Sequence, residues 1–241
     1  GKTAPEWAWR LNMGALLNVR EVARQHKLDK VFWPSSISAF GPTTPADATP
    51  QRTVMEPSTV YGISKLAGEG WCRWYFENHG VDVRGLRYPG LISYKASPGG
   101  GTTDYAIDIF HAALKGERYT CFLAEDEPLP MLYMDDAVRG TLELMEATNS
   151  AITERGSYNL AGVSFTPREI AQEIRKHLPD FEIVYEPDFR QAIASGWPDS
   201  IDDSCARRDW GWAPRYDLAA TVRDMLNNLS RRLNPRSTVT A

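Results

Sequence analysis

The segment VFWPSSISAFG at residues 31–41 and the segment TVYGISKLAGEGW at residues 59–71 together decide the fold predicted from this sequence. The first begins with a short apolar run and ends in proline and serine, which is typical of a buried strand in a parallel sheet. The second predicts a helix from about Thr59 to Asn78, which Gly80 ends.

The elements on either side fit the same architecture. A second strand is predicted from Val81 to Tyr88, and a helix with a broad apolar face from Pro5 to about His26. A strand, a helix and a strand in this order indicate a right-handed parallel crossover. The predicted fold class is therefore α/β, with helices covering a parallel sheet.

The second half of the chain has a mixed pattern. Thr166 and Glu169 form a capping box that opens a short helix. Further helices are predicted at about 103–115, 135–147 and 218–229, and strand-like runs at 119–123, 131–134, 157–160 and 182–185. We expect three regions: 1–95 as the C-terminal part of a nucleotide-binding domain, 96–233 as a substrate-binding lobe with returning elements of that domain, and 234–241 as a disordered tail.

Composition excludes several classes of protein. The net charge is −4, so nucleic acid and anionic membranes are poor candidate partners. The sequence contains no apolar stretch of 18 residues, which excludes a membrane span, and its four histidines show no metal-ligand spacing. Three cysteines, an odd number, suit a reducing compartment, and we expect a cytoplasmic protein without a metal.

Tyr61 and Lys65 are the candidate catalytic pair. They are four residues apart and share one face of the predicted helix. A free tyrosine has a pKa of about 10, and a nearby cation lowers it, so such a pair can take a proton from an alcohol. The spacing alone is weak, because tyrosine and lysine often meet in this way by chance.

Serine residues at the end of the first predicted strand strengthen this interpretation. Ser35, Ser36 and Ser38 lie about 25 residues before Tyr61. The carboxyl end of a parallel strand is where such sheets bind ligands. Turn formation is the alternative explanation for these hydroxyl groups.

These motifs resemble the extended short-chain dehydrogenases and the NDP-sugar epimerases, the NAD-dependent epimerase/dehydratase family. The resemblance implies a Rossmann-type doubly wound parallel sheet, lacking its first strands here, with a smaller mixed α/β substrate lobe. It places the catalytic serine at Ser36 and the general base at Tyr61. It implies that Lys65 binds the nicotinamide ribose and lowers the tyrosine pKa. Asn12 resembles the helix asparagine that supports the site in this family.

The resemblance also implies NAD as cofactor. The residues expected to contact it, besides Tyr61 and Lys65, are Ser35, Tyr88, Pro89, Gly90 and Leu91. The glycine-rich turn that binds the cofactor phosphates in this family is not present near Gly1. A protein that truly began there would bind NAD poorly, and the choice between NAD and NADP rests on the resemblance.

Several longer segments resemble the short-chain type of L-threonine 3-dehydrogenase within this family. The most specific are PGGGTTDY at 98–105 and WPDSIDDS at 197–204. Three glycines let the backbone approach a ligand, and Thr102 and Asp104 open a helix whose N–H groups favour a carboxylate. Helix capping alone also explains these two residues. The resemblance favours Thr102, Asp104 and Trp197 as contacts of L-threonine.

Two other functions remain open. An NDP-sugar 4-epimerase shares Ser36, Tyr61 and Lys65, and a non-catalytic Rossmann-like binding protein needs none of them. Apolar and aromatic residues cover wide faces of the helices at 5–26 and 59–79, including Trp71, Trp74, Tyr75 and Phe76, and core packing explains much of this. Related enzymes that pair these two helices favour a homodimer.

Overall fold

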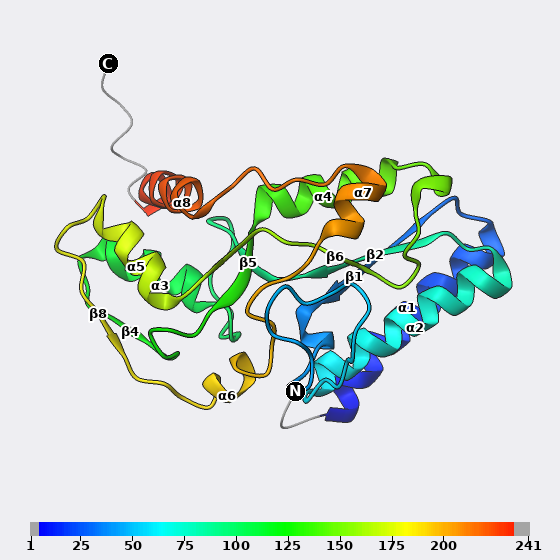
Figure 1. Ribbon diagram of the computed structural model, residues 1–241, viewed down its shortest axis with the longest axis horizontal. Helices are drawn as coiled ribbons and strands as arrows, with labels where there is room; N and C mark the ends of the chain where they lie inside the picture. The colour runs from blue at the N-terminus through cyan, green and yellow to red at the C-terminus, as the bar shows by residue number, and fades with distance from the viewer. Residues whose placement is uncertain (1–4, 234–241) are drawn as a thin grey trace, which may run out of the picture. The chain divides into compact units, whose positions relative to one another are not determined.

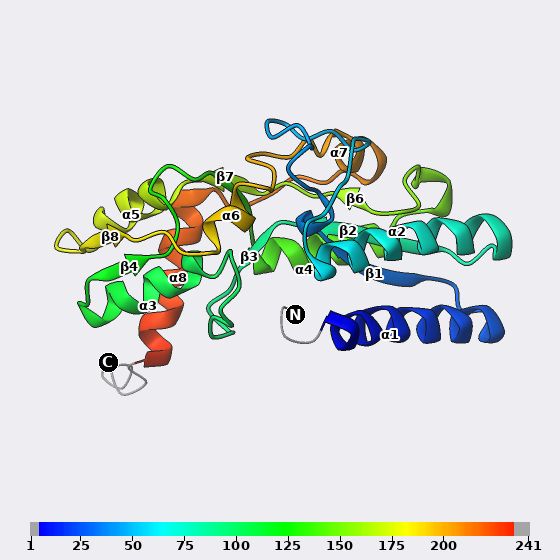
Figure 2. The same cartoon turned by 90° about the horizontal axis from the view of Figure 1, so that it is seen from below.

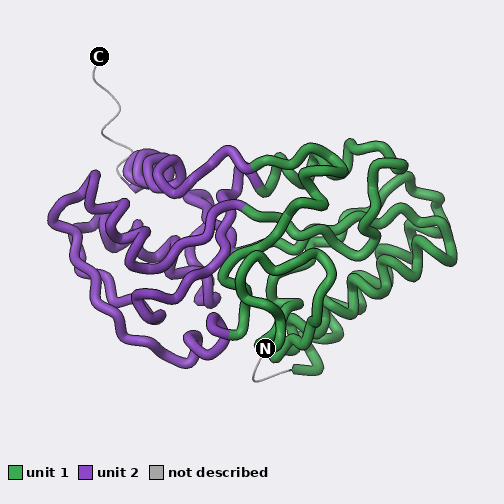
Figure 3. Tube along the Cα trace, viewed as in Figure 1, with its two compact units in different colours: residues 1–89, 137–161, 196–213 green, residues 90–136, 162–195, 214–241 purple. Residues whose placement is uncertain are grey.

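The computed structural model describes residues 5–233, which form two compact units (Figures 1 and 3). Within those residues, unit 1 runs to Pro89 and includes Ala137–Ala161 and Gly196–Ala213. Unit 2 comprises Gly90–Asp136, Gly162–Ser195 and the chain from Pro214. The division into domains near residue 95 stays a prediction, and the predicted tail at 234–241 lies outside the described residues.

Unit 1 contains a parallel sheet in the order β1-β2-β6. Its strands are β1 (Val31–Ser36), β2 (Val83–Tyr88) and β6 (Tyr158–Asn159). Helix α2 (Val60–His79) connects β1 to β2, which pair in parallel along their whole length. The predicted α/β class and parallel crossover are therefore confirmed.

Helices α1 (Pro5–His26) and α2 lie side by side in this unit (Figures 1 and 2). Their buried side chains and those of the two long strands form one core. Its members are Met13, Leu16, Ala23, Val31, Trp33, Cys72, Tyr75, Val81 and Val83. Burying this apolar area, at about 25 cal/mol per Å², is what holds the two helices against the sheet.

Both ends of α2 follow the sequence prediction. The Thr59 side chain accepts a hydrogen bond from the Gly62 N–H at 3.0 Å, which caps the first turn. Gly80 ends the helix at a φ of 67°, a left-handed conformation that glycine adopts without steric cost. The helix that carries Tyr61 therefore has a fixed start and a fixed end.

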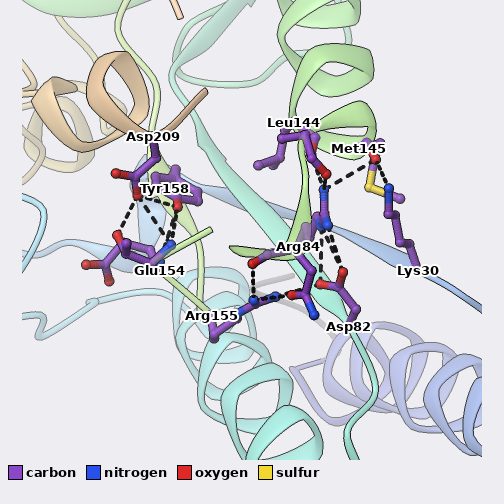
Figure 4. A network of polar contacts seen from close by, with 12 residues as sticks. Lys30, Asp82, Arg84, Leu144, Met145, Glu154, Arg155, Tyr158 and Asp209 are labelled. Atoms are coloured by element: carbon purple, nitrogen blue, oxygen red, sulfur yellow. Dashed lines mark hydrogen bonds and ion pairs between the residues drawn. The ribbon is translucent and has the colours of Figure 1, made fainter. Parts of the chain in front are cut away.

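The opposite face of the sheet carries helix α4 (Met134–Glu146), whose carboxyl end is capped by a buried arginine (Figure 4). Arg84, 0% exposed, donates to the carbonyls of Leu144 at 2.6 Å and Ala147 at 2.7 Å. Its other nitrogens donate to the carboxylate of Asp82, which also pairs with Arg155. Carbonyls that would otherwise lack partners at the helix end are satisfied in this way.

Unit 2 combines a mixed sheet, a two-stranded parallel sheet and three helices that pack on one another. The mixed sheet has the order β3-β5-β7 and consists of β3 (Gly90–Ile92), β5 (Leu129–Tyr133) and β7 (Val163–Phe165). The other strands are β4 (Tyr119–Cys121) and β8 (Ile183–Tyr185), and the helices are α3 (Tyr105–Lys115), α5 (Pro167–Arg175) and α8 (Leu218–Leu233). The capping box predicted at Thr166 and Glu169 is confirmed.

Short elements account for the differences from the sequence prediction. The structure adds β3 and β7, the helices α6 (Gln191–Ala194) and α7 (Ser204–Trp210), and the 3-10 turns η1 (Ile37–Ala39) and η2 (Asn149–Ala151). Each is too short to produce a readable periodicity. No helix within residues 5–233 combines the length and apolar character that a membrane crossing requires.

Replacing Arg84 with alanine should destabilise the protein by about 3–5 kcal/mol, because it leaves the buried Asp82 carboxylate and the α4 carbonyls short of partners. Arg52→Ala is the matched control. Arg52 also pairs with a carboxylate, that of Glu154, but its side chain is 80% exposed, so the loss should stay below about 1 kcal/mol. Urea denaturation measures both, and equal losses would contradict the role given to Arg84.

Candidate active site

Strand β1 ends in Ser36, the predicted catalytic serine. Its backbone is extended, and its Oγ accepts a hydrogen bond from the Ser38 N–H at 3.2 Å, so Ser36 caps the turn η1. The structure of Ser36 is therefore compatible both with turn formation and with the predicted role as catalytic serine. The cap fixes the direction of the hydroxyl group at the carboxyl end of the strand.

Tyr61 and Lys65 lie one turn apart on α2, close to this strand end. Tyr61 is 48% exposed, whereas Lys65 is 9% exposed. The Lys65 ammonium lies 5.2 Å from the centre of the Tyr61 ring and donates to the Pro34 carbonyl at 2.5 Å. The side chain of Ser36 lies close enough to Tyr61 to lower the pKa of its phenol. The structure thus brings the three predicted catalytic residues together.

The electrostatics of Tyr61 differ from the expectation. Burial raises the pKa of Tyr61, and the hydrogen bond with Ser36 opposes this rise without cancelling it. The expected lowering of this pKa by Lys65 is not found. The Lys65 ammonium is directed at the Pro34 carbonyl and lies 4.6 Å from the centre of the Trp33 ring, and burial lowers its own pKa.

Asn12 lies on helix α1 and is hydrogen bonded to the first turn of α2. Its Nδ2 donates to the Ser64 Oγ at 3.1 Å, and the Ser64 hydroxyl donates to the Tyr61 carbonyl at 2.7 Å. The backbone of Tyr61 is therefore tied to a second helix.

The other residues expected to contact the cofactor lie at Ser35 on β1 and in the consecutive run from Tyr88 to Leu91. The Ser35 side chain is 2% exposed and donates to Glu69, so any contact with a cofactor falls to its backbone. The Tyr88 hydroxyl is hydrogen bonded to Thr141. Pro89 ends the first part of unit 1, and Gly90 and Leu91 begin β3 in unit 2. Their contact with a cofactor stays a prediction.

The triglycine segment in unit 2 is closed by Asp104. Its carboxylate accepts hydrogen bonds from the N–H groups of Gly99 at 2.6 Å and Gly101 at 2.9 Å. Helix α3 begins at Tyr105 and not at Thr103, and the Asp104 side chain makes no capping bond to it. Asp104 holds the loop, and its pairing with a substrate ammonium, like the contact of the buried Thr102, stays a prediction.

Trp197 packs against an apolar cluster in unit 1 formed by Ile37, Phe40 and Ile201. Packing explains its presence, and its predicted part in closing a substrate pocket is a proposal.

Sequence reasoning missed a group of buried polar residues next to the catalytic pair. Glu69 accepts from Ser35 at 2.5 Å and from Arg87 at 2.8 Å. Arg87 also donates to the Gln51 carbonyl and to the side chain of Asn159. Two signals in the sequence point to this group: Glu69 continues the four-residue spacing of Tyr61 and Lys65, and Arg87 is a charged residue within the predicted strand.

Residues 2–161 match the NAD dependent epimerase/dehydratase family. The chain belongs to this family. An uncharacterized epimerase/dehydratase of Staphylococcus haemolyticus is 49% identical over 95% of the chain and 72% of that protein. The family resemblance expected from the motifs is confirmed.

Solved structures extend the comparison. The holo form of a GalE-like L-threonine dehydrogenase from Cupriavidus necator is 71% identical, with a TM-score of 0.94 over 95% of this chain and 74% of that one. An L-threonine 3-dehydrogenase from Trypanosoma brucei is 39% identical, with a TM-score of 0.93 over 98% and 73%. These likenesses confirm the Rossmann-type fold.

Membership of this family makes NAD the cofactor, and the donor set at the end of β1 fits its nicotinamide riboside end. An ammonium carries three N–H donors, and the Pro34 carbonyl takes one from Lys65, which leaves donors for ribose hydroxyl groups. Tyr61 adds a half-exposed phenol beside them. Across residues 5–233 no cluster of three or more histidine, cysteine or acidic side chains is arranged to hold a metal ion.

Gly62→Ala should disturb the site, because an added Cβ would lie 2.0 Å from the Ser38 carbonyl oxygen. We expect a loss of about 1–3 kcal/mol as α2 shifts from η1. Gly70→Ala, on the same helix with nothing within 4 Å, should gain up to about 1 kcal/mol. Thermal and urea denaturation of the pair tests this, and a Gly62→Ala protein as stable as wild type would contradict the close approach.

Proposed function

We propose that this chain is an oxidoreductase that uses NAD to oxidise L-threonine at its 3-hydroxyl, forming 2-amino-3-oxobutanoate. The observation that carries the proposal is the grouping of Ser36, Tyr61 and Lys65 at the carboxyl end of β1. The substrate is supported by the L-threonine dehydrogenases to which the chain is 39–71% identical.

The chemistry assigned to the chain is the removal of one proton. The Ser36 hydroxyl donates a hydrogen bond to the substrate oxygen and orients it toward Tyr61. Tyr61 in its deprotonated form takes the hydroxyl proton as the bond between C3 and its hydrogen breaks. Because burial raises the pKa of Tyr61, the share of this form grows as the pH rises. When bound, NAD supplies the acceptor for the hydride.

Lys65 acts as the group that holds the ribose. Its ammonium is fixed by the Pro34 carbonyl and so presents its remaining donors in a set direction. Holding both reactants in one geometry is worth several kcal/mol of the barrier.

The amino-acid end of the substrate is assigned to Thr102, Asp104 and Trp197. Asp104 already holds the Gly99–Gly101 segment, and the absence of side chains on the three glycines allows a ligand to approach closely. The carboxylate of Asp104 suits an ammonium, and the N–H groups at the start of helix α3 suit a carboxylate.

Tyr61→Phe should lower the rate of threonine-dependent NADH formation by about 10²–10⁴-fold, because the phenol oxygen is the only part removed. The fold should persist, with a circular dichroism spectrum and melting temperature close to those of wild type. The absorbance of NADH at saturating threonine measures the rate. An NDP-sugar epimerase would give no threonine-dependent signal, and a binding protein would be indifferent to the substitution.

We also propose a cytoplasmic homodimer that pairs α1 and α2 across a two-fold axis. All three cysteines are free thiols, which suits a reducing compartment. Large apolar side chains are exposed on these two helices, which supports burial against a second copy. They are Trp7, Trp9, Leu11, Val19, Val22, Ile63, Trp71 and Trp74.

Analytical ultracentrifugation at micromolar concentration should give the mass of two chains. Trp71→Glu with Trp74→Glu should shift the protein to the mass of one chain, because burying charged side chains in an apolar interface carries a large desolvation cost. Val138→Glu with Leu142→Glu is the control and should leave the dimer intact, because these two exposed apolar residues lie on α4. A monomer in the wild type would reject the proposal, and one solved relative is described as monomeric.

A further inference from the structure

Glu69 and Arg87 form a buried ion pair beside the end of β1, the strand that carries Ser36. Glu69 is 2% exposed and Arg87 is 4% exposed. Arg87 Nε and Nη2 donate to the Glu69 carboxylate at 3.0 Å and 2.8 Å, and the Ser35 Oγ donates to Glu69 Oε1 at 2.5 Å. One carboxylate therefore joins α2, β1 and β2.

Stability alone is a weak explanation for this pair. Taking two charges out of water costs several kcal/mol for each ion, and well-packed apolar residues often replace a buried pair with no loss. The pair does give a fixed geometry. Arg87 is held further by the Gln51 carbonyl at 2.8 Å and the Asn159 Oδ1 at 3.0 Å, so Glu69 has little freedom to move.

The positions of these contacts connect them to the site. Tyr61, Lys65 and Glu69 follow one another at four-residue intervals on one face of α2. Pro34, Ser35 and Ser36 are consecutive at the end of β1. Lys65 binds the Pro34 carbonyl and Glu69 binds the Ser35 hydroxyl, so two adjacent residues of the strand are tied to two successive turns of the helix.

We propose that Glu69 is a positioning residue: by holding Ser35 it fixes the backbone of Ser36, and with it the approach of the Ser36 hydroxyl to the Tyr61 phenol. The proposal rests on the proposed function in so far as the reaction uses those two groups. A purely structural role would require only that the helix stay packed on the sheet.

Ser35→Ala tests the link most directly, because it removes one hydrogen bond and leaves the Glu69–Arg87 pair in place. In the Ser35→Ala protein, kcat for threonine should fall about 10-fold while KM changes less than about twofold, since the lost contact acts on the reacting geometry. Ser157→Ala is the matched control. Ser157 is also buried in unit 1, but its hydroxyl donates only to the neighbouring Gly156 carbonyl.

A second readout does not depend on the substrate. The ring-carbon resonance of Tyr61, labelled with ¹³C and assigned by its absence from Tyr61→Phe, should titrate at higher pH in Ser35→Ala than in wild type. The hydrogen bond with Ser36 opposes the rise in the pKa of Tyr61, so loosening Ser36 raises that pKa further. Lys65, the charged side chain beside the ring, is unchanged in both proteins.

A double variant tests Glu69 itself, because a single change at Glu69 would leave the buried Arg87 without its carboxylate partner. Glu69→Leu with Arg87→Met removes both charges together and should remain folded. It should show the same loss of kcat and the same displaced Tyr61 titration as Ser35→Ala.

The outcomes separate the two proposals. Wild-type kcat and an unchanged Tyr61 titration in both Ser35→Ala and the folded double variant would overturn the positioning role. A wild-type protein that does not oxidise threonine, but whose Tyr61 titration moves in Ser35→Ala, would overturn the proposed function and support the positioning role.

Discussion

The close approach of helix α2 to strand β1 is the constraint on which the rest of the site depends. Two glycines allow it: an added Cβ would lie 2.0 Å from the Ser38 carbonyl at Gly62 and 2.3 Å from the Trp33 ring at Gly68. At this separation the Lys65 side chain reaches the Pro34 carbonyl and Tyr61 reaches Ser36. A helix with ordinary side chains at both positions would stand further from the sheet, and neither contact would form.

The sheet of unit 1 uses a buried arginine on each face, for different purposes. Arg84 and Arg87 are three residues apart on β2, so their side chains point to opposite faces. Arg84 binds the carbonyls at the end of α4 (Figure 4), whereas Arg87 binds Glu69 of α2. Arg84 thus joins the end of α4 to the strand, and Arg87 joins one face of α2 to it. Both use directional hydrogen bonds, which apolar packing does not supply. The sheet therefore fixes the helices in rotation as well as in distance.

Much of this arrangement was predictable from the sequence, and the rest depended on long-range packing. The apolar run before Ser36, the Thr59 cap and Gly80 are local signals, and they place β1 and α2 within one or two residues. The catalytic grouping followed from the spacing and the family resemblance. Glu69 and Arg87 are 18 residues apart, and no local rule says that one charged residue buries against the other. The raised pKa of Tyr61 could not be predicted for the same reason, because it depends on how burial and Ser36 combine and on where the Lys65 ammonium points.

The Asp104 carboxylate has a consequence for affinity. A run of three glycines loses more backbone entropy on ordering than any other three residues, and Gly100 sits at a φ of 85°. Since Asp104 binds the N–H groups on either side of Gly100, that ordering is completed during folding. The segment is therefore preorganised for a ligand. The free energy of the ligand's contacts is not reduced by the entropic cost of ordering the loop.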